Sequence, residues 1–247
     1  MTQWWRSLYR IPRWVRIGAV SILAGVLIGF AMAQWASSSV IGHYVSPGSI
    51  LVGADQRTLT ASTGGACQTG SLDVQENPST VVVRVHLWPA VMIAPGSCAL
   101  EIFSARLSEP LGSRRLIDGV TGAGLPSFDG RGILRPTFLP AGFAHRYDAA
   151  FFGNDTVAGA TAGCTQVYTQ GNSYDESIWI SQITGGHWRT PEGIHARPIV
   201  VRGRRGLAIA GEIEWAEGGQ LFTIQSMTYA YATLSDQALI AIANSLR

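Results

Sequence analysis

The side chains that most often carry out catalysis are few and scattered in this sequence. The five histidines are His43, His86, His145, His187 and His195, and no two of them lie within four residues of each other. This spacing does not match the helical pattern in which two histidines bind one metal ion. The sequence also lacks the Gly-x-Ser-x-Gly elbow of serine hydrolases and the glycine-rich loop that binds phosphate. We therefore expect neither an enzyme nor a protein with a metal ion or another cofactor.

One segment gathers polar side chains that could line a site. His187 and His195 flank a loop rich in glycine and proline, which also contains Trp188, Arg189 and Glu192. We interpret this segment as an ordinary polar loop. The 16 carboxylates are spread along the chain, and no pair stands out as the acid and base of a glycoside hydrolase.

The three cysteines suggest one disulfide bond. Cys67 and Cys98 flank a strongly β-forming segment, and a bridge that closes about thirty residues would stabilise the fold by roughly 3–4 kcal/mol. Two buried free thiols are the alternative, since neither cysteine has a second Cys or a His at metal-ligand spacing. Cys164 is then left over, as a small buried apolar side chain, or as a partner in an intermolecular bridge or a lipid contact.

Charge is distributed unevenly along the chain. All 18 basic residues are arginines, and four of them, Arg6, Arg10, Arg13 and Arg16, precede a long apolar segment. The remainder has 14 arginines against 16 carboxylates and is nearly neutral. It lacks the basic surface that nucleic-acid recognition requires, so we expect no nucleic-acid partner.

The apolar segment predicts a transmembrane helix. Residues 17–36 contain no charge, and twenty helical residues span about 30 Å, the thickness of the hydrocarbon core of a bilayer. Because the arginines precede this span and the first charge after it is Asp55, the positive-inside rule places residues 1–16 in the cytoplasm. We expect residues 37–47 to link the span to an extracytoplasmic remainder, which makes the chain a single-pass protein of the cell membrane.

Aromatic side chains flank the predicted span, as they do at the two interfaces of a membrane. Those before the span are Trp4, Trp5, Tyr9 and Trp14, and those on the far side are Trp35 and Tyr44. A cleaved signal peptide is the alternative, because Ala31-Met32-Ala33 resembles a cleavage site. The long polar leader and the continuation of the apolar run to Ala36 favour a retained anchor. The sequence leaves open whether a signal peptidase cuts after Ala33.

Small residues recur every four positions within the span. They are Ser21, Gly25, Gly29 and Ala33. A stripe of this kind lets a second helix approach closely. We expect it to contact a transmembrane helix of a second copy or of another membrane protein; the general abundance of such residues in membrane helices is the competing explanation.

Short strand-forming segments separated by turns fill residues 48–127. Segments 57–62, 80–88 and 99–107 are the clearest. In the second, Val81, Val83, Val85 and Leu87 fall on one face of a strand, and Val82, Arg84, His86 and Trp88 on the other. A β-sandwich-like module is the predicted architecture.

This module resembles one that is common in uncharacterised secreted and membrane-anchored proteins of high-GC bacteria. The matching residues are Gly65-Ala-Cys67, Leu72–Glu76, the valine-rich strand, Cys98, Pro110-Leu-Gly-x-Arg114 and Asp118-Gly-x-Thr-Gly122. The resemblance implies no catalytic role. The last two stretches are explained by turns that start near Pro110 and Asp118, with a pair between Arg114 and Asp118 as a further possibility.

After a boundary at residues 128–132, residues 131–247 predict an antiparallel sheet and a final helix. The candidate strands are His145–Phe152, Cys164–Thr169, Ser177–Ile183, Ile199–Arg202, Gly206–Ile209, Glu212–Ala216 and Gln220–Gln225. Ser235 is the expected N-cap of the helix. The apolar stripe of the helix consists of Leu239, Ile240, Ile242, Ala243 and Leu246.

The order of these elements resembles the C-terminal domain of bacterial anti-sigma-factor-like envelope proteins and their lipoprotein-carrier-like relatives. The matching residues are Phe138–Phe143, Ile178–Gln182, Val200–Gly203, Ile213–Trp215, Leu234-Ser235 and Ile242–Leu246. The resemblance implies a curved antiparallel sheet around helices, and no agreed active site. The 16 residues before the predicted span are too few for a sigma-binding domain, so we expect no direct anti-sigma role.

The sequence thus predicts an α+β protein with a transmembrane helix, a β-sandwich-like module and an antiparallel sheet with a C-terminal helix. We expect a non-enzymatic accessory or scaffold subunit of a membrane protein assembly, with the bilayer and other membrane subunits or a second copy as partners. The alternative is an envelope sensor or a lipid- or lipoprotein-binding module. An open cavity lined by apolar side chains would favour the alternative.

Overall fold

The computed structural model describes residues 42–63, 69–88, 101–151, 157–171, 176–188, 195–209, 211–228 and 234–247. These residues are mostly β-strand, with the α-helix α2 (Asp236–Asn244) near the C-terminus, as the sequence predicts. The predicted span, its small-residue stripe, Cys67 and Cys98 lie outside the described residues. In the part of the chain that is described, no helix has the length and apolar character needed to cross a bilayer. The chain divides into the compact units Met1–His43 and Tyr44–Arg247, and the second is described below.

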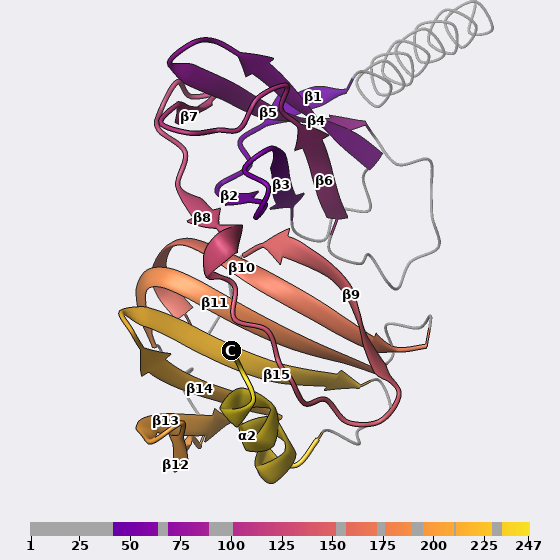
Figure 1. Ribbon diagram of the computed structural model, residues 1–247, viewed down its shortest axis with the longest axis vertical. Coiled ribbons are helices and arrows are strands. Elements are labelled where there is room, and N and C mark those ends of the chain that lie inside the picture. The colour runs from indigo at the N-terminus through magenta and orange to yellow at the C-terminus, as the bar shows by residue number, and fades with distance from the viewer. Residues whose placement is uncertain are drawn as a thin grey trace, which may run out of the picture. The chain divides into compact units, whose positions relative to one another are not determined.

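Two four-stranded sheets make up the N-terminal part of this unit (Figure 1). The first contains β1 (His43–Val45), β5 (Thr80–Trp88) and β4 (Thr69–Glu76) in that order, with β7 (Arg115–Asp118) also paired to β5. The order in the second is β6 (Glu101–Arg106), β3 (Thr58–Thr63), β2 (Ile50–Val52) and β8 (Ser127–Asp129). The sequence predicted β3, β5 and β6 but missed β4 and the shortest strands, β1, β2, β7 and β8, in which three or four residues show no periodicity.

The valine-rich strand β5 alternates as predicted. Val81, Val83, Val85 and Leu87 are at most 5% exposed and belong to one core. This core also contains residues of β2, β3 and β6, so the two sheets bury their inner faces against the same side chains. The opposite face of β5 is half-buried up to His86 and exposed at Trp88.

The Pro-Leu-Gly-x-Arg stretch lies between β6 and β7, and its arginine holds it against the end of β4. Arg114 pairs with Glu76, with 2.7 Å between Nη1 and Oε2, and not with Asp118. Its other nitrogens donate to backbone carbonyls of its own loop. The Ser108 backbone N–H and the Arg114 guanidinium lower the pKa of Glu76 to about 2. Asp118 instead accepts hydrogen bonds within its own turn, from Val120 N at 2.8 Å and Thr121 Oγ1 at 2.6 Å.

An antiparallel sheet of seven strands forms the C-terminal part. Its order is β12 (Arg197–Val201), β13 (Arg204–Ile209), β14 (Glu212–Glu217), β15 (Gln220–Thr228), β11 (Glu176–Trp188), β10 (Val157–Gln170) and β9 (Phe143–Ala150). All seven predicted strands are present, but β10 and β11 are longer than expected. Both faces of their central segments are buried, so the polar residues there do not mark a surface.

Helix α2 covers one face of this sheet, across β12, β14 and β15 (Figure 1). Ser235 caps its N-terminus as predicted, since Oγ accepts from Ala238 N at 3.3 Å. Leu239, Ile242 and Ala243 are fully buried against the sheet, in a core that contains the stacked rings of Trp215 and Phe222. The chain end is held by two backbone hydrogen bonds between Arg135 and Arg247.

The predicted boundary at residues 128–132 falls where β8 ends and the 3₁₀ turn η3 (Gly130–Gly132) begins. The regions on either side of it share buried contacts. Leu51 and Phe128 pack with Ala150, Ala162 and Cys164, and Ser62 Oγ donates to Ala150 O at 2.5 Å. Residues 44–247 accordingly form one compact unit.

Two isoleucines of α2 provide a test of this packing. Ile242 is fully buried, whereas Ile240 only borders the core. Ile242→Ala should lower the free energy of unfolding by about 3 kcal/mol and Ile240→Ala by about 1 kcal/mol. Both substitutions change helix propensity equally, so the difference, measured by urea unfolding of the detergent-solubilised chain, reports burial alone. Equal effects would contradict the described orientation of the helix.

Candidate functional site

A cluster of titratable side chains lies at the β9–β10 end of the large sheet. Arg135 Nη2 lies 2.6 Å from Asp148 Oδ2, and His145 Nε2 lies 2.8 Å from Asp148 Oδ1. Gln166 and Tyr168 complete it, with the Tyr168 hydroxyl donating to Gln166 Oε1 at 2.8 Å. We refer to these five residues as the Arg135 cluster.

A β-bulge brings the cluster together. Residues three apart on a regular strand point to opposite faces, yet His145 and Asp148 share a partner. The register between β9 and β10 shifts at this point, because Tyr147 pairs with Val167 while His145 pairs with Tyr168. The extra residue, Arg146, turns His145 to the side of Asp148.

The electrostatics of the cluster favour fixed charges over proton transfer. Burial alone would raise the pKa of Asp148, but hydrogen bonds from Arg135 and His145 outweigh it and leave the pKa below its ordinary value. Burial raises the pKa of Tyr168 to about 12, although Arg135 opposes this change. An acid that stays ionised and a phenol that stays protonated are poor proton donors and acceptors near neutral pH.

Cys164 does not supply a nucleophile to this cluster. It is 1% exposed, unpaired and packed among apolar side chains. Burial raises the pKa of its thiol, which is the opposite of what a reactive cysteine requires. In the register of β9 and β10 it lies opposite Ala150, whereas His145 lies opposite Tyr168, four residues further along β10.

An open groove lies at the opposite edge of the same sheet. It has a volume of about 570 Å³, and its lining consists of Trp188, Pro198, Ile199, Val200, Arg205, Gly206 and Leu207. We call it the Trp188 groove. Most of its lining is apolar, and its volume lies within the range of small-molecule sites, about 300–1,000 Å³.

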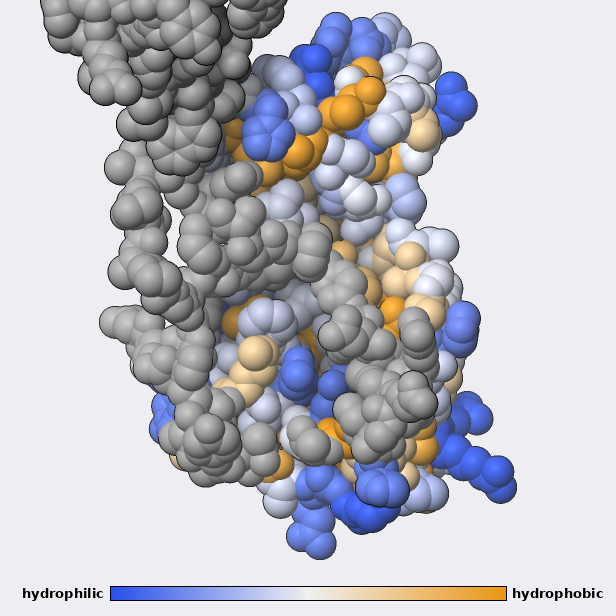
Figure 2. Space-filling model, turned by 180° about the vertical axis from the view of Figure 1, so that it is seen from behind, coloured by the Kyte–Doolittle hydropathy of each residue, from blue (hydrophilic) through white to orange (hydrophobic). Residues whose placement is uncertain are grey.

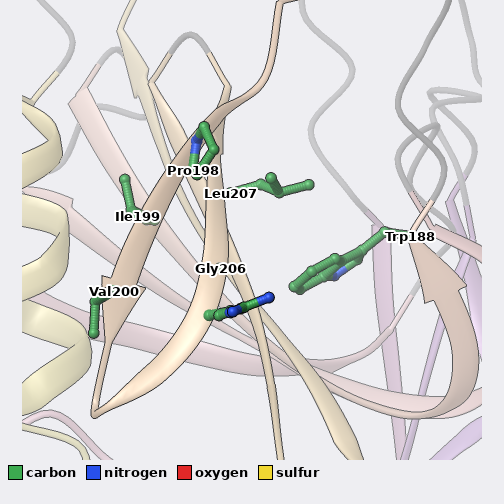
Figure 3. Close-up of a pocket in the computed structure, with 7 residues that line it drawn as sticks. Trp188, Pro198, Ile199, Val200, Gly206 and Leu207 are labelled. Carbon is green, nitrogen blue, oxygen red and sulfur yellow. The ribbon is translucent and has the colours of Figure 1, made fainter.

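Glycines place Trp188 in this groove. Thr184 is the last residue of β11 that pairs with β15, and residues 185–188 continue beside β10 alone. Gly185 and Gly186 have φ angles of 71° and 84°, a region that residues with a Cβ rarely adopt. They turn the end of β11 so that the indole faces the β12–β13 hairpin at Gly206 and Leu207 (Figure 3).

The hairpin presents its outer face to the groove. Val201 and Ala208 belong to the core under α2. Val200 and Arg205 form one cross-strand pair, and Pro198 and Leu207 form another, so these four alternate with the core residues and point away from α2. Val200 is 66% exposed, which is unusual for an apolar residue in a strand of a folded domain.

The groove contains two groups suited to a polar end of a ligand. Trp188 Nε1 is buried and has no hydrogen-bond partner among the described residues. Arg205 is exposed and forms no ion pair within the described part of the chain. Its neighbours Arg197 and Arg202 are already paired, with Asp236 and Glu217 respectively.

The structure describes some of the site residues predicted from the sequence and not others. The loop that contains His187, Trp188 and His195 was interpreted as an ordinary polar loop, but Trp188 lines the groove. Arg189 and Glu192 lie outside the described residues. The Arg135 cluster escaped sequence analysis, because the bulge that joins His145 to Asp148 leaves no mark in their spacing. In the described ranges, no group of three or more His, Cys, Asp or Glu side chains is placed to bind a metal ion.

No protein-family model and no curated protein matches the chain.

Replacing Asp148 tests the structural role of the Arg135 cluster. Asp148→Asn should lower the free energy of unfolding at pH 7 by about 2 kcal/mol, because two charged hydrogen bonds are weakened. Since the pKa of Asp148 is lowered by folding, its contribution is present above the ordinary value of 3.8 and is lost as the pH falls below it. Urea unfolding at pH 7 and pH 3 should therefore show a difference between variant and parent that shrinks in acid. Glu109→Gln, at an exposed carboxylate, should match the parent at both values.

Labelling of Cys164 tests its burial. A maleimide added to the folded chain should leave Cys164 unmodified over hours, because a buried thiol is inert. The same reagent should modify it fully in about 6 M guanidinium, where the chain is unfolded. Mass spectrometry of the tryptic peptide 147–189 isolates this cysteine from the other two. Rapid labelling in the folded state would show that the thiol is accessible.

Proposed function

We propose that this chain is a non-enzymatic, membrane-anchored binding protein that holds an amphiphilic ligand, of the lipid class, in the Trp188 groove. The single observation that carries the proposal is this groove, open and mainly apolar, on an exposed face of the sheet. It corresponds to the lipid-binding alternative derived from the sequence.

The position of the groove restricts where a ligand binds. The face of the sheet under α2 is filled by Trp215, Phe222, Ile224 and the side chains of the helix, so no ligand fits between sheet and helix. The Trp188 groove offers a surface instead, with Gly206 and Leu207 facing the indole (Figure 3), while Trp188 and Ile199 also pack against the core under α2. An acyl chain would bury this apolar surface, at roughly 25 cal/mol for each Å² removed from water.

The polar groups of the groove favour an amphiphile with an anionic head. The Trp188 N–H is already buried without a partner among the described residues, so the exposed Arg205 is the polar group that a ligand reaches directly. A carboxylate or phosphate would pair with Arg205. The cationic hairpin, with Arg204 beside Arg205, attracts such a head group over a distance of about 10 Å at moderate salt.

The accessory-subunit role stays a prediction. It depends on Ser21, Gly25, Gly29 and Ala33 of the predicted span, which lie outside the described residues. The membrane location in the proposal depends on the same span.

Photolabelling tests the ligand. Native membranes that contain the full chain are incubated with a diazirine derivative of palmitate and irradiated, and modified peptides are identified by mass spectrometry. We expect adducts on the peptides that contain Trp188 and residues 198–209. Leu207→Trp fills the groove and should reduce these adducts at least tenfold, which corresponds to about 1.4 kcal/mol of binding free energy.

Two further variants make this test specific. Met227→Trp adds an indole at another exposed position of the sheet and should leave labelling unchanged. Arg205→Gln should reduce labelling by palmitate about fivefold, the effect of a partly exposed ion pair, and should not affect labelling by the uncharged alcohol. Equal labelling in Leu207→Trp and Met227→Trp would show that the groove is not the binding site.

A further inference from the structure

An unusual set of side chains covers the outer face of β1, β5 and β4. Tyr44 and Trp88 are 45% and 40% exposed, although large aromatic side chains usually stabilise a fold by burial. The ring of His86 lies between theirs, with centroids 4.7 Å from each. The guanidinium carbon of Arg84 lies 4.8 Å from the centre of the Tyr44 ring. We call these four residues the aromatic face.

The neighbouring strands fix this arrangement. Arg84, His86 and Trp88 alternate with the buried residues of β5, and Tyr44 Oη donates to Asp73 Oδ2 on β4 at 3.1 Å. A Cβ at Gly119 would come within 2.5 Å of Arg84 Cγ, so the glycine lets the arginine stem lie flat on the sheet. The stem is therefore packed while the head of the side chain points outward.

Arg84 has one carboxylate near it, that of Asp73, and forms no ion pair with it. Asp73 lies opposite Arg84 in the register of β4 and β5, but its carboxylate accepts from Tyr44 and Ser71. Within the described ranges, Arg84 forms no ion pair. The aromatic face thus combines indole, phenol and imidazole rings with one cation, which lies across from the carboxylate of Asp73.

The position of Tyr44 in the chain identifies the partner. Tyr44 follows the last residue of the predicted span, Ala36, by eight residues, and eight extended residues reach at most about 27 Å. The aromatic face therefore stays close to the membrane surface. Tyrosine and tryptophan, with an apolar ring and a polar end, are the residues enriched at the lipid headgroups, and arginine binds phosphate there.

We infer that the aromatic face rests in the headgroup layer of the membrane that anchors the chain, with Arg84 on lipid phosphates. A sugar-binding platform built on Tyr44 fits less well, because such a site needs an open ring face. The ring of Tyr44 already packs against both Arg84 and His86. Figure 2 shows the molecule from behind, with hydrophilic and hydrophobic residues mixed over the surface that is not grey.

This inference rests on the membrane anchor of the proposed function, and the test separates the two. The full chain is placed in vesicles of phosphatidylcholine and phosphatidylglycerol, with the photoreactive residue p-benzoylphenylalanine in place of Trp88. After irradiation, mass spectrometry measures lipid adducts. The matched control carries the same residue in place of Phe138, a large apolar side chain that is 49% exposed and lies outside the aromatic face. A third chain carries it in place of Trp35, at the predicted end of the span.

We expect at least tenfold more lipid adduct at position 88 than at position 138, and strong labelling at position 35. Adding Arg84→Gln should lower the adduct at position 88 about fivefold in these vesicles, the effect of one cation near an anionic surface. In vesicles of phosphatidylcholine alone the effect of Arg84→Gln should be smaller.

Labelling at position 35 without an excess at position 88 would overturn the inference and leave the anchor intact. Adducts with protein, in place of lipid, at position 88 would also overturn the inference and would indicate a protein partner for the aromatic face. The absence of lipid adducts at position 35 would overturn the anchor and the inference with it. None of these outcomes bears on the Trp188 groove, because the palmitate experiment maps adducts on Trp188 and residues 198–209.

Discussion

The C-terminal sheet is governed by one constraint: its helix is too short to cover it. Nine residues make a helix of about 13 Å, whereas seven strands extend over about 29 Å. Helix α2 covers β12, β14 and β15, and the strands β9 to β11 need another cover. The segment after η3 supplies it, held at the chain end by the backbone hydrogen bonds between Arg135 and Arg247. An extended segment has unpaired N–H and C=O groups, which must find partners when buried.

This requirement explains the polar residues inside the sheet. Gln182 is fully buried, where it accepts from Leu134 N at 2.6 Å and donates to Gly132 O. Gln166 is also fully buried and donates to Leu134 O at 2.8 Å. The two glutamines therefore act as partners for the backbone of the covering segment. The Trp188 groove lies at the other edge of the sheet, on the β12–β13 hairpin.

Local features of the fold were predictable, and features that join distant segments were not. The alternation in β5 and the cap at Ser235 depend on neighbours in sequence, so the pattern alone gives them. The burial of Gln166 and Gln182 depends on a segment more than thirty residues away. Trp188 belongs to a groove whose other residues lie on strands not paired with its own. In both cases the missing information is tertiary contact, which periodicity does not encode.

Most of the shifted pKa values among the described groups move away from neutral pH, which suits fixed charges better than proton transfer. General acids and bases work best with pKa values near the ambient pH. The shifted carboxyls of Glu76, Asp118 and Asp148 lie below their ordinary pKa values, because donors from loops and arginines hold them ionised. The Cys164 thiol and the Tyr168 phenol move the other way through burial. Among the described groups with a shift, only Glu101 has a pKa that moves toward neutral pH. Burial on β6 raises this pKa. Carboxylates that stay ionised in this way hold loops and strands together. The surfaces that expose aromatic and apolar side chains, the Trp188 groove and the aromatic face, are therefore the ones we propose for binding.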